Sequence, residues 1–146
     1  MVFRFKQRQV ADPLAQQNFE QLTGLIGQLQ FSQVAAQETT SSQTYGNLAT
    51  PGPSITIPSA GEWLVGWGAT IEAASQNRGL ASIDATDASA VQAAMGNPAA
   101  QSQGGSVAMM RSMTLAKGQV ITMTYRNAIA ATVSYEKRWI AALKIS

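Results

Sequence analysis

The sequence predicts a mainly β protein, an antiparallel jelly-roll sandwich that follows an N-terminal arm and a short helix. Most of the chain after residue 53 consists of short segments that alternate between apolar and polar residues, with Gly and Pro between them. Helical periodicity occurs in one segment near the N-terminus. Near residue 90 a possible N-cap, good helix formers and a Gly and Pro that would end the helix predict a second, short helix. The 146 residues are enough for a single well-packed core.

The first ten residues, MVFRFKQRQV, alternate and predict a strand or an extended arm. Phe3 and Phe5 would lie on one side of it. The basic residues on the other side are Arg4, Lys6 and Arg8. Two interpretations remain open, a frayed terminus or an arm that docks on a neighbouring subunit, since two Phe side chains disfavour solvent.

A helix is predicted over residues 13–30, because Asp12 is a good N-cap and Pro13 suits the first helical position. Its apolar residues recur at spacings of three and four, as in a short heptad run: Phe19, Leu22, Ile26 and Leu29. Two heptads alone are marginal in water. We therefore expect the helix to pack on its own domain or against the same helix of symmetry mates.

Residues 32–53 are small, polar and rich in Gly and Pro, which predicts a linker. We place a boundary near residue 44. Residues 1–43 would form the arm, helix and linker, and residues 44–146 the β domain. The strands expected in that domain span residues 54–58, 61–74, 79–86, 106–115, 119–128 and 131–145, and a short helix is expected over residues 87–98.

The segment GEWLVGWGATIEAA, residues 61–74, has two unlike faces. Trp63 and Trp67 share one face with other apolar residues, and we assign that face to the core. Gly66 and Gly68 lie on the other face, where we expect another backbone or a neighbouring protomer to approach closely. Three further aromatic residues are expected in the core or in a trimer interface: Tyr125, Tyr135 and Trp139. As the alternative, these three and the two tryptophans of residues 61–74 would form a sugar-binding platform.

The residue types argue against catalysis. The chain has no His and no Cys, which excludes a Ser-His-Asp triad, thiol chemistry and an ordinary zinc site. Asp84 and Asp87 are interpreted as a solvated strand end and a helix cap rather than as a metal or glycosidase site. We expect no catalytic residues, no metal and no cofactor.

Charge is sparse, at 12% of residues, and the net charge is +2. The scattered basic residues do not predict nucleic-acid binding, and no apolar run approaches 18 residues, so no membrane span is predicted. A surface poor in charge favours extensive subunit contacts. The cluster YEKRW contains Glu136, Lys137 and Arg138, which would form a solvated face with local ion pairs or an intersubunit salt bridge.

Three segments together resemble a β domain of structural proteins of tailed bacteriophages and prophages: YGNLATPGPSITIPSAGEWLVGWGATIEA, SMTLAKGQVITMTYRN and ATVSYEKRWIAALKI. The shared features include Tyr45, Gly52-Pro53, the Leu115–Gly118 turn, Tyr125-Arg126 and Arg138-Trp139. The pattern over residues 44–146 is also similar to trimeric jelly rolls of the tumour-necrosis-factor and complement type, which pack around a threefold axis.

The resemblance implies a non-enzymatic virion protein, a homotrimer that decorates or cements a capsid. The arm would then bind the major capsid protein or another virion protein, on the capsid exterior. The alternative is a receptor-binding module of a head or tail fibre, whose loops, including residues 87–105, bind cell-surface glycan. A glycan hydrolase acting through Asp84 and Asp87 is a third, weaker alternative.

Overall fold

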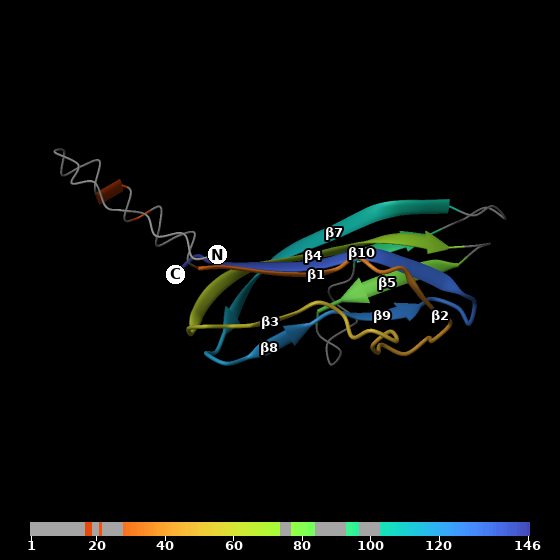
Figure 1. The fold of residues 1–146 in the computed structure, drawn as a ribbon, viewed down its shortest axis with the longest axis horizontal. Coiled ribbons are helices and arrows are strands. Elements are labelled where there is room, and N and C mark those ends of the chain that lie inside the picture. The colour runs from red at the N-terminus through yellow and green to blue at the C-terminus, as the bar shows by residue number, and fades with distance from the viewer. Residues whose placement is uncertain (1–16, 19–20, 22–27, 74–76, 84–92, 97–102) are drawn as a thin grey trace.

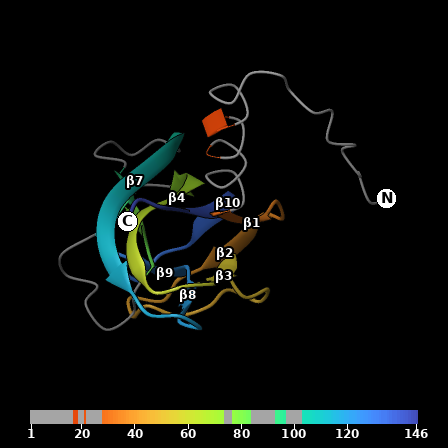
Figure 2. The ribbon, with the colours of Figure 1, turned by 90° about the vertical axis from the view of Figure 1, so that its left-hand side faces the viewer.

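The computed structural model of this chain describes residues 17–18, 21, 28–73, 77–83, 93–96 and 103–146. These residues form a two-layered antiparallel β sandwich (Figures 1 and 2). The predicted arm, the pair Asp84 and Asp87, and the predicted helix positions Phe19, Leu22 and Ile26 lie outside the described residues. Gln17, Asn18 and Gln21 are helical and exposed, as expected for the polar side of the predicted N-terminal helix.

One layer is a five-stranded sheet, here called the larger sheet. Its strands in spatial order are β1 (Leu29–Val34), β10 (Val133–Lys144), β4 (Gly61–Ala73) and β7 (Gln103–Leu115), and β2 (Glu38–Thr40) also pairs with β10. Every pairing is antiparallel, and β4 and β7 are matched over their whole length. The long paired strands make this layer the framework of the molecule.

The second layer consists of two small sheets that lie below the larger sheet in Figure 1. One pairs β3 (Ser54–Thr56) with β8 (Val120–Thr122), and the other contains β6 (Ala93–Gly96), β5 (Arg78–Ser82) and β9 (Thr124–Asn127). The strands predicted after residue 53 are therefore present, with residues 119–128 divided between β8 and β9. The mainly β, antiparallel fold predicted from alternation is confirmed.

The core lies between the two layers. It is built from the inward residues of β4 and β10 in the larger sheet and from the residues of the two small sheets that face them. Trp63, Trp67, Tyr125 and Tyr135 are all at most 1% exposed. The rings of Tyr125 and Tyr135 pack at a centroid distance of 5.1 Å, a tilted aromatic pair. The face of β4 that carries its tryptophans thus faces the interior, as its alternation predicts.

Three sequence-based expectations are wrong for part of their range. Ser32–Val34 and Glu38–Thr40, predicted as linker, are strands, because β1 and β2 hydrogen-bond to β10 and extend the larger sheet before residue 44. Leu29 opens β1 instead of continuing the helix. Ala93–Gly96, predicted as helix, forms β6, because pairing with β5 outweighs the helix propensity of Ala and Met.

A β-bulge interrupts the pairing of β10 with β4 between Glu136 and Trp139, and Lys137 has a φ of 47° there. The extra residue changes which way the following side chains point. Before the bulge Tyr135 is buried; after it Arg138 and Ile140 are buried, and Trp139 is not. Strict alternation from Tyr135 would have placed Trp139 in the core and Arg138 outside.

Candidate functional site

The outer face of the larger sheet is the most distinctive surface of the described molecule. Residues opposite one another on neighbouring strands form rows across the sheet. Three consecutive rows project from the face opposite the core: Leu29–Leu143–Leu64–Ser112, Phe31–Ala141–Gly66–Met110 and Gln33–Trp139–Gly68–Ala108. We call these residues the outer patch. None of them carries a charge.

Large apolar side chains of the outer patch meet solvent. Phe31 is 59% exposed, Met110 64% and Leu29 52%, although each belongs to a regular strand. Single exposed apolar residues are ordinary on protein surfaces, but a contiguous apolar area marks an interaction surface. Here the side chains lie in adjacent rows of one sheet, so they form one continuous area.

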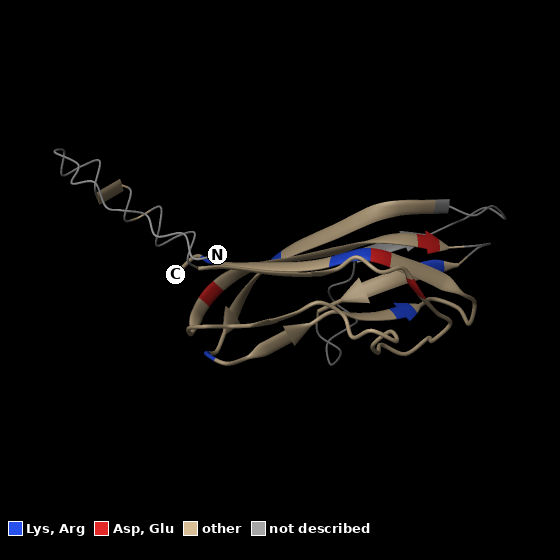
Figure 3. Ribbon diagram, viewed as in Figure 1, with Lys and Arg blue, Asp and Glu red and all other residues tan. Residues whose placement is uncertain are grey.

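Charged residues flank the outer patch at both ends of β4. Glu62 is exposed beyond the first row, and Glu72 is exposed toward the other end, where Glu136 is also half-exposed. Arg111 is the one charged residue of β7, and the long remainder of that strand is uncharged (Figure 3). An apolar centre with a charged border is the arrangement expected of a protein contact surface.

The indole of Trp139 lies across Gly66 and Gly68 of β4. A Cβ atom built on Gly68 would be 2.9 Å from Trp139 Cε2 and Nε1, and one built on Gly66 would be 3.4 Å from Trp139 Cζ3. The Gly68 Cβ would also lie 2.5 Å from the Val107 carbonyl oxygen. Two groups of the same chain therefore approach Gly68 closely, the Trp139 indole and the Val107 backbone carbonyl. The close approach of another backbone is confirmed at Gly68, and the approach of a neighbouring protomer stays a prediction.

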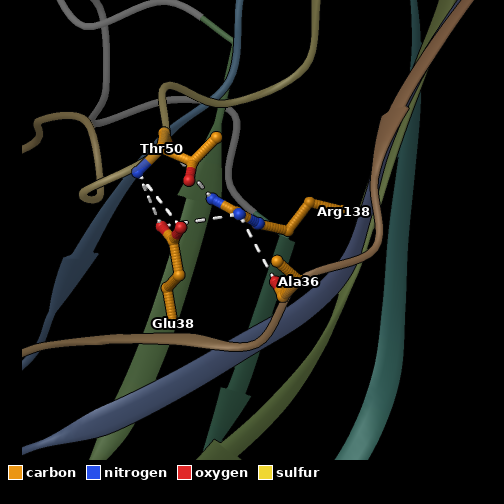
Figure 4. A network of polar contacts seen from close by, with 4 residues as sticks. All are labelled: Ala36, Glu38, Thr50 and Arg138. Carbon is orange, nitrogen blue, oxygen red and sulfur yellow. Dashed lines mark hydrogen bonds and ion pairs between the residues drawn. The ribbon is translucent and has the colours of Figure 1, made fainter.

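Arg138, turned inward by the bulge, is completely buried and is held by a polar network (Figure 4). Its Nη2 lies 3.5 Å from Glu38 Oε2 and donates to the Ala36 carbonyl, and its Nη1 donates to the Thr50 carbonyl. Its guanidinium also lies 5.5 Å from the ring centre of Tyr125. Arg138 thus joins β10 to the β1–β2 connection and to the loop before β3.

Glu38 completes this network by accepting hydrogen bonds from the Thr50 backbone N–H at 3.1 and 3.0 Å. Hydrogen bonding from Thr50, with a smaller contribution from the Arg138 guanidinium, holds the pKa of Glu38 below its usual value of 4.5. Burial raises the pKa of Tyr125 to about 12. The network therefore keeps one carboxylate ionised and one phenol neutral, which suits a fixed structural role.

The YEKRW cluster does not form a single solvated face. Glu136 and Lys137 make a local ion pair of 3.5 Å on the surface, but Arg138 points into the sandwich. Both interpretations offered from the sequence are therefore wrong for Arg138, because the bulge reverses the alternation. Among the described residues, no group of three or more His, Cys, Asp or Glu side chains is placed to hold a metal.

Sequence reasoning missed several members of the outer patch: Phe31, Leu64, Met110, Ala141 and Leu143. Their signal was present in the apolar–polar alternation of LQFSQV and in the apolar residues on both faces of β4 and β10. This signal was not used for two reasons. Residues 32–53 were predicted as a linker, and the β10 bulge contains no Gly or Asn that would indicate a bulge in the sequence. The described residues include no helix long and apolar enough to cross a membrane.

No model of a known protein family matches this chain, and no curated protein matches it. Among solved structures it is similar to Eiger TNF from S. frugiperda, at 12% identity and a TM-score of 0.52, over 81% of this chain and 93% of that chain. That likeness shows the fold alone. With the antiparallel layers described above, it makes the fold a jelly-roll sandwich.

Two carbohydrate-binding modules overlap more loosely. The C-terminal CBM6 of the laminarinase LamC from Zobellia galactanivorans is 12% identical, with a TM-score of 0.34 over 80% of this chain and 99% of that chain. The CBM6cm-2 module of Cellvibrio mixtus lichenase 5A, solved with cellotriose, is 17% identical, with a TM-score of 0.26 over 78% of this chain and 90% of that chain.

Proposed function

We propose that this chain is a non-enzymatic structural protein of a phage virion, which forms a homotrimer and decorates or cements the capsid exterior. The observation that supports self-association is the outer patch, an uncharged apolar area across four strands of one sheet. The virion assignment is supported by the motif resemblance of residues 44–146. The patch has no group that would perform chemistry, and its composition suits permanent contact with another apolar surface.

The physical case for the trimer follows from the patch itself. Burying Phe31, Met110 and Leu29 removes apolar surface from water, at about 25 cal/mol per Å². Interfaces of permanent assemblies are more apolar than ordinary surface, and a ring of three closes without leaving a patch exposed. The rigid ladder between β4 and β7 keeps the patch in shape before association.

The capsid contact is assigned to the arm, whose alternating Phe3, Phe5, Arg4, Lys6 and Arg8 provide an apolar side and a basic side. Ordering an extended arm on a capsid surface costs conformational entropy. Three arms on one trimer offset that cost, because binding of the first raises the effective concentration of the others. The partner would be the major capsid protein or another virion protein.

Deleting residues 1–10 tests the capsid assignment. By native mass the truncated protein should still be a trimer, and the far-UV circular dichroism of its β domain should be unchanged. It should no longer sediment with capsids that lack the protein. A variant with Lys117→Ala, an exposed turn residue far from the arm in sequence, serves as a binding control. Normal capsid occupancy by the truncated trimer contradicts the proposed role of the arm.

A glycan-binding role is the second candidate, and one observation favours it over enzymatic roles. Of the aromatic residues considered as a sugar platform, Trp63, Trp67, Tyr125 and Tyr135 are buried, but Trp139 is partly exposed on the outer face. A partly exposed indole can stack on a sugar ring. Binding on a glycan array that is lost in Trp139→Ala would favour this role over the capsid role.

A further inference from the structure

The outer face of the three-stranded small sheet carries two arginines. Tyr125 and Asn127 of β9 are buried, so Arg126, which lies between them, projects from the face away from the core. A Cβ atom built on Gly79 of β5 would meet side chains of the larger sheet, so its exposed neighbour Arg78 also projects away from the core. This face and the outer patch are on opposite sides of the sandwich (Figure 1), so a contact through the outer patch does not cover it.

The two arginines are neighbours on this face. Arg126 is opposite Leu80 in the pairing of β5 with β9, and the Ala128 N–H donates to the Arg78 carbonyl at 2.8 Å, which continues that pairing to Arg78. Arg78 and Arg126 are therefore diagonal neighbours, a separation that long side chains span. Both salt bridges among the described residues involve other cations, so no described carboxylate neutralises these two charges. Two positive charges side by side favour an anion between them.

Tyr45 holds the Arg126 guanidinium in place. Gly46 and Tyr125 exchange two backbone hydrogen bonds, at 3.1 and 3.0 Å, which places the preceding residue, Tyr45, beside Arg126. The Cζ atom of Arg126 lies 5.1 Å from the centre of the Tyr45 ring, a cation–π contact. The Tyr45 hydroxyl and Arg126 Nε are buried, and neither makes a hydrogen bond of ordinary geometry with a described residue. Burial raises the pKa of Tyr45 above its usual 10.0, against the opposing effect of Arg126 and Arg78, so the phenol stays a neutral O–H donor.

The interior contains a matching arrangement that includes an anion. Arg138 Cζ lies 5.5 Å from the centre of the Tyr125 ring, and the Glu38 carboxylate lies 3.5 Å from Arg138 Nη2. An arginine over a tyrosine ring is thus completed by a carboxylate inside the sandwich. The pair on the surface has a second arginine beside it and no described carboxylate. A guanidinium matches the two oxygens of a carboxylate in shape as well as in charge.

We propose that Arg78, Arg126 and Tyr45 form a binding site for the carboxylate group of a small ligand, either a sugar acid or a simple organic acid. The guanidinium groups of the two arginines donate to the carboxylate oxygens, and the Tyr45 ring keeps that of Arg126 in position. All three residues come from one chain, so the site does not depend on the proposed homotrimer.

Titration of ¹⁵N-labelled protein followed by NMR tests the site, with sodium glucuronate and sodium acetate as probes and glucose as the uncharged control. Sodium chloride keeps the ionic strength constant. We expect saturable shifts of the Arg126 Nε–H and the Gly46 backbone N–H with both carboxylates and none with glucose. Tighter binding of glucuronate than of acetate identifies a sugar acid, and equal affinities identify a simple carboxylate. No saturable shift with either, or an equal shift with chloride alone, overturns the proposal.

Substitutions separate the site from general charge effects, with the Gly46 N–H as the signal. Arg126→Gln and Arg78→Gln should each weaken binding about tenfold or more, because hydrogen bonds between charged groups are the strong ones. Arg126→Lys keeps the charge but loses the planar fork, so it should also bind more weakly. Arg111→Gln removes an exposed arginine of β7 outside the site and should leave the affinity unchanged. Should Arg126→Gln lose the native spectrum, the exposed Arg78 decides. Equal affinities of Arg78→Gln and Arg111→Gln overturn the proposal.

Discussion

The two faces of β4 are built from alternate residues of one strand and serve opposite purposes. The inner face carries Trp63 and Trp67, which are fully buried, and Trp67 Nε1 donates to the Ala81 carbonyl at 3.3 Å. The outer face carries Gly66 and Gly68, which leave room for Trp139 of the neighbouring strand. Tryptophan therefore forms part of the core on the inner face of the sheet and part of the surface on its outer face. Alternation along β4 places Trp63 and Trp67 inside, and the β10 bulge places Trp139 outside.

Replacing one tryptophan from each face should show the largest difference. Trp67→Ala leaves a cavity between the layers and should reduce the free energy of unfolding by about 3–5 kcal/mol. Trp139→Ala removes a partly exposed ring and should cost only about 1–2 kcal/mol. Urea unfolding of both variants at one protein concentration measures the pair. Equal losses of unfolding free energy in the two variants would show that the two faces do not differ as described.

Breaking the buried ion pair should come next. Glu38→Ala leaves Arg138 buried without its carboxylate, and removal of one partner of a buried pair costs about 3–5 kcal/mol. We expect the lower end, because the Glu38 side chain is 14% exposed. Glu136→Ala breaks the exposed pair with Lys137 and should cost at most about 1 kcal/mol. A similar loss in both variants contradicts the account of the network.

The same network predicts a pH dependence. The folded-state pKa of Glu38 is lowered from 4.5, so its stabilising effect is present above pH 4.5 and is lost as the pH falls through the lower folded value. Glu38→Gln should therefore flatten the acid limb of a plot of unfolding free energy against pH. If the acid limb is identical to that of the unmodified chain, the loss of stability in acid comes from other carboxylates and not from Glu38.

Adding one methyl group to Gly66 or Gly68 should give the smallest but most specific effect. Gly68→Ala places a Cβ 2.5 Å from the Val107 carbonyl and 2.9 Å from the Trp139 ring, so backbone must move, at about 1–3 kcal/mol. Gly66→Ala meets nothing closer than 3.4 Å and should cost less. Thermal unfolding and Trp fluorescence of the two variants test this order. A greater loss of stability in Gly66→Ala than in Gly68→Ala would contradict it.

Much of the fold was predictable from the sequence, because alternation and turn residues mark most of the strands. Trp63 and Trp67 are four residues apart, an even spacing, so the two-residue period of a strand places them on the same face. β1 and β2 were not predictable in the same way. β2 is only three polar residues long, and the alternation of β1 lies where a helix and a linker were predicted. Both form strands because β10 supplies hydrogen-bond partners from the other end of the chain.

The candidate site was less predictable, because it depends on one local irregularity. Lys137 adopts a positive φ without being Gly or Asn, so the bulge has no sequence signal. Without it, Arg138 is assigned to the surface and Trp139 to the core. The outer patch also needs strand order, since Phe31, Ala141, Gly66 and Met110 come from four distant segments that only the pairing brings together.

The most direct test of the central claim is the native mass of the full chain beside that of Met110→Asp, with Lys117→Asp as a control. Met110 lies in the outer patch and is 64% exposed, so a carboxylate there should barely disturb the folded subunit. We predict a trimer for the unmodified chain and for Lys117→Asp, and dissociation to folded monomers for Met110→Asp. A monomeric unmodified chain, or a Met110→Asp trimer as stable as the original, would contradict the claim that the outer patch is the assembly surface.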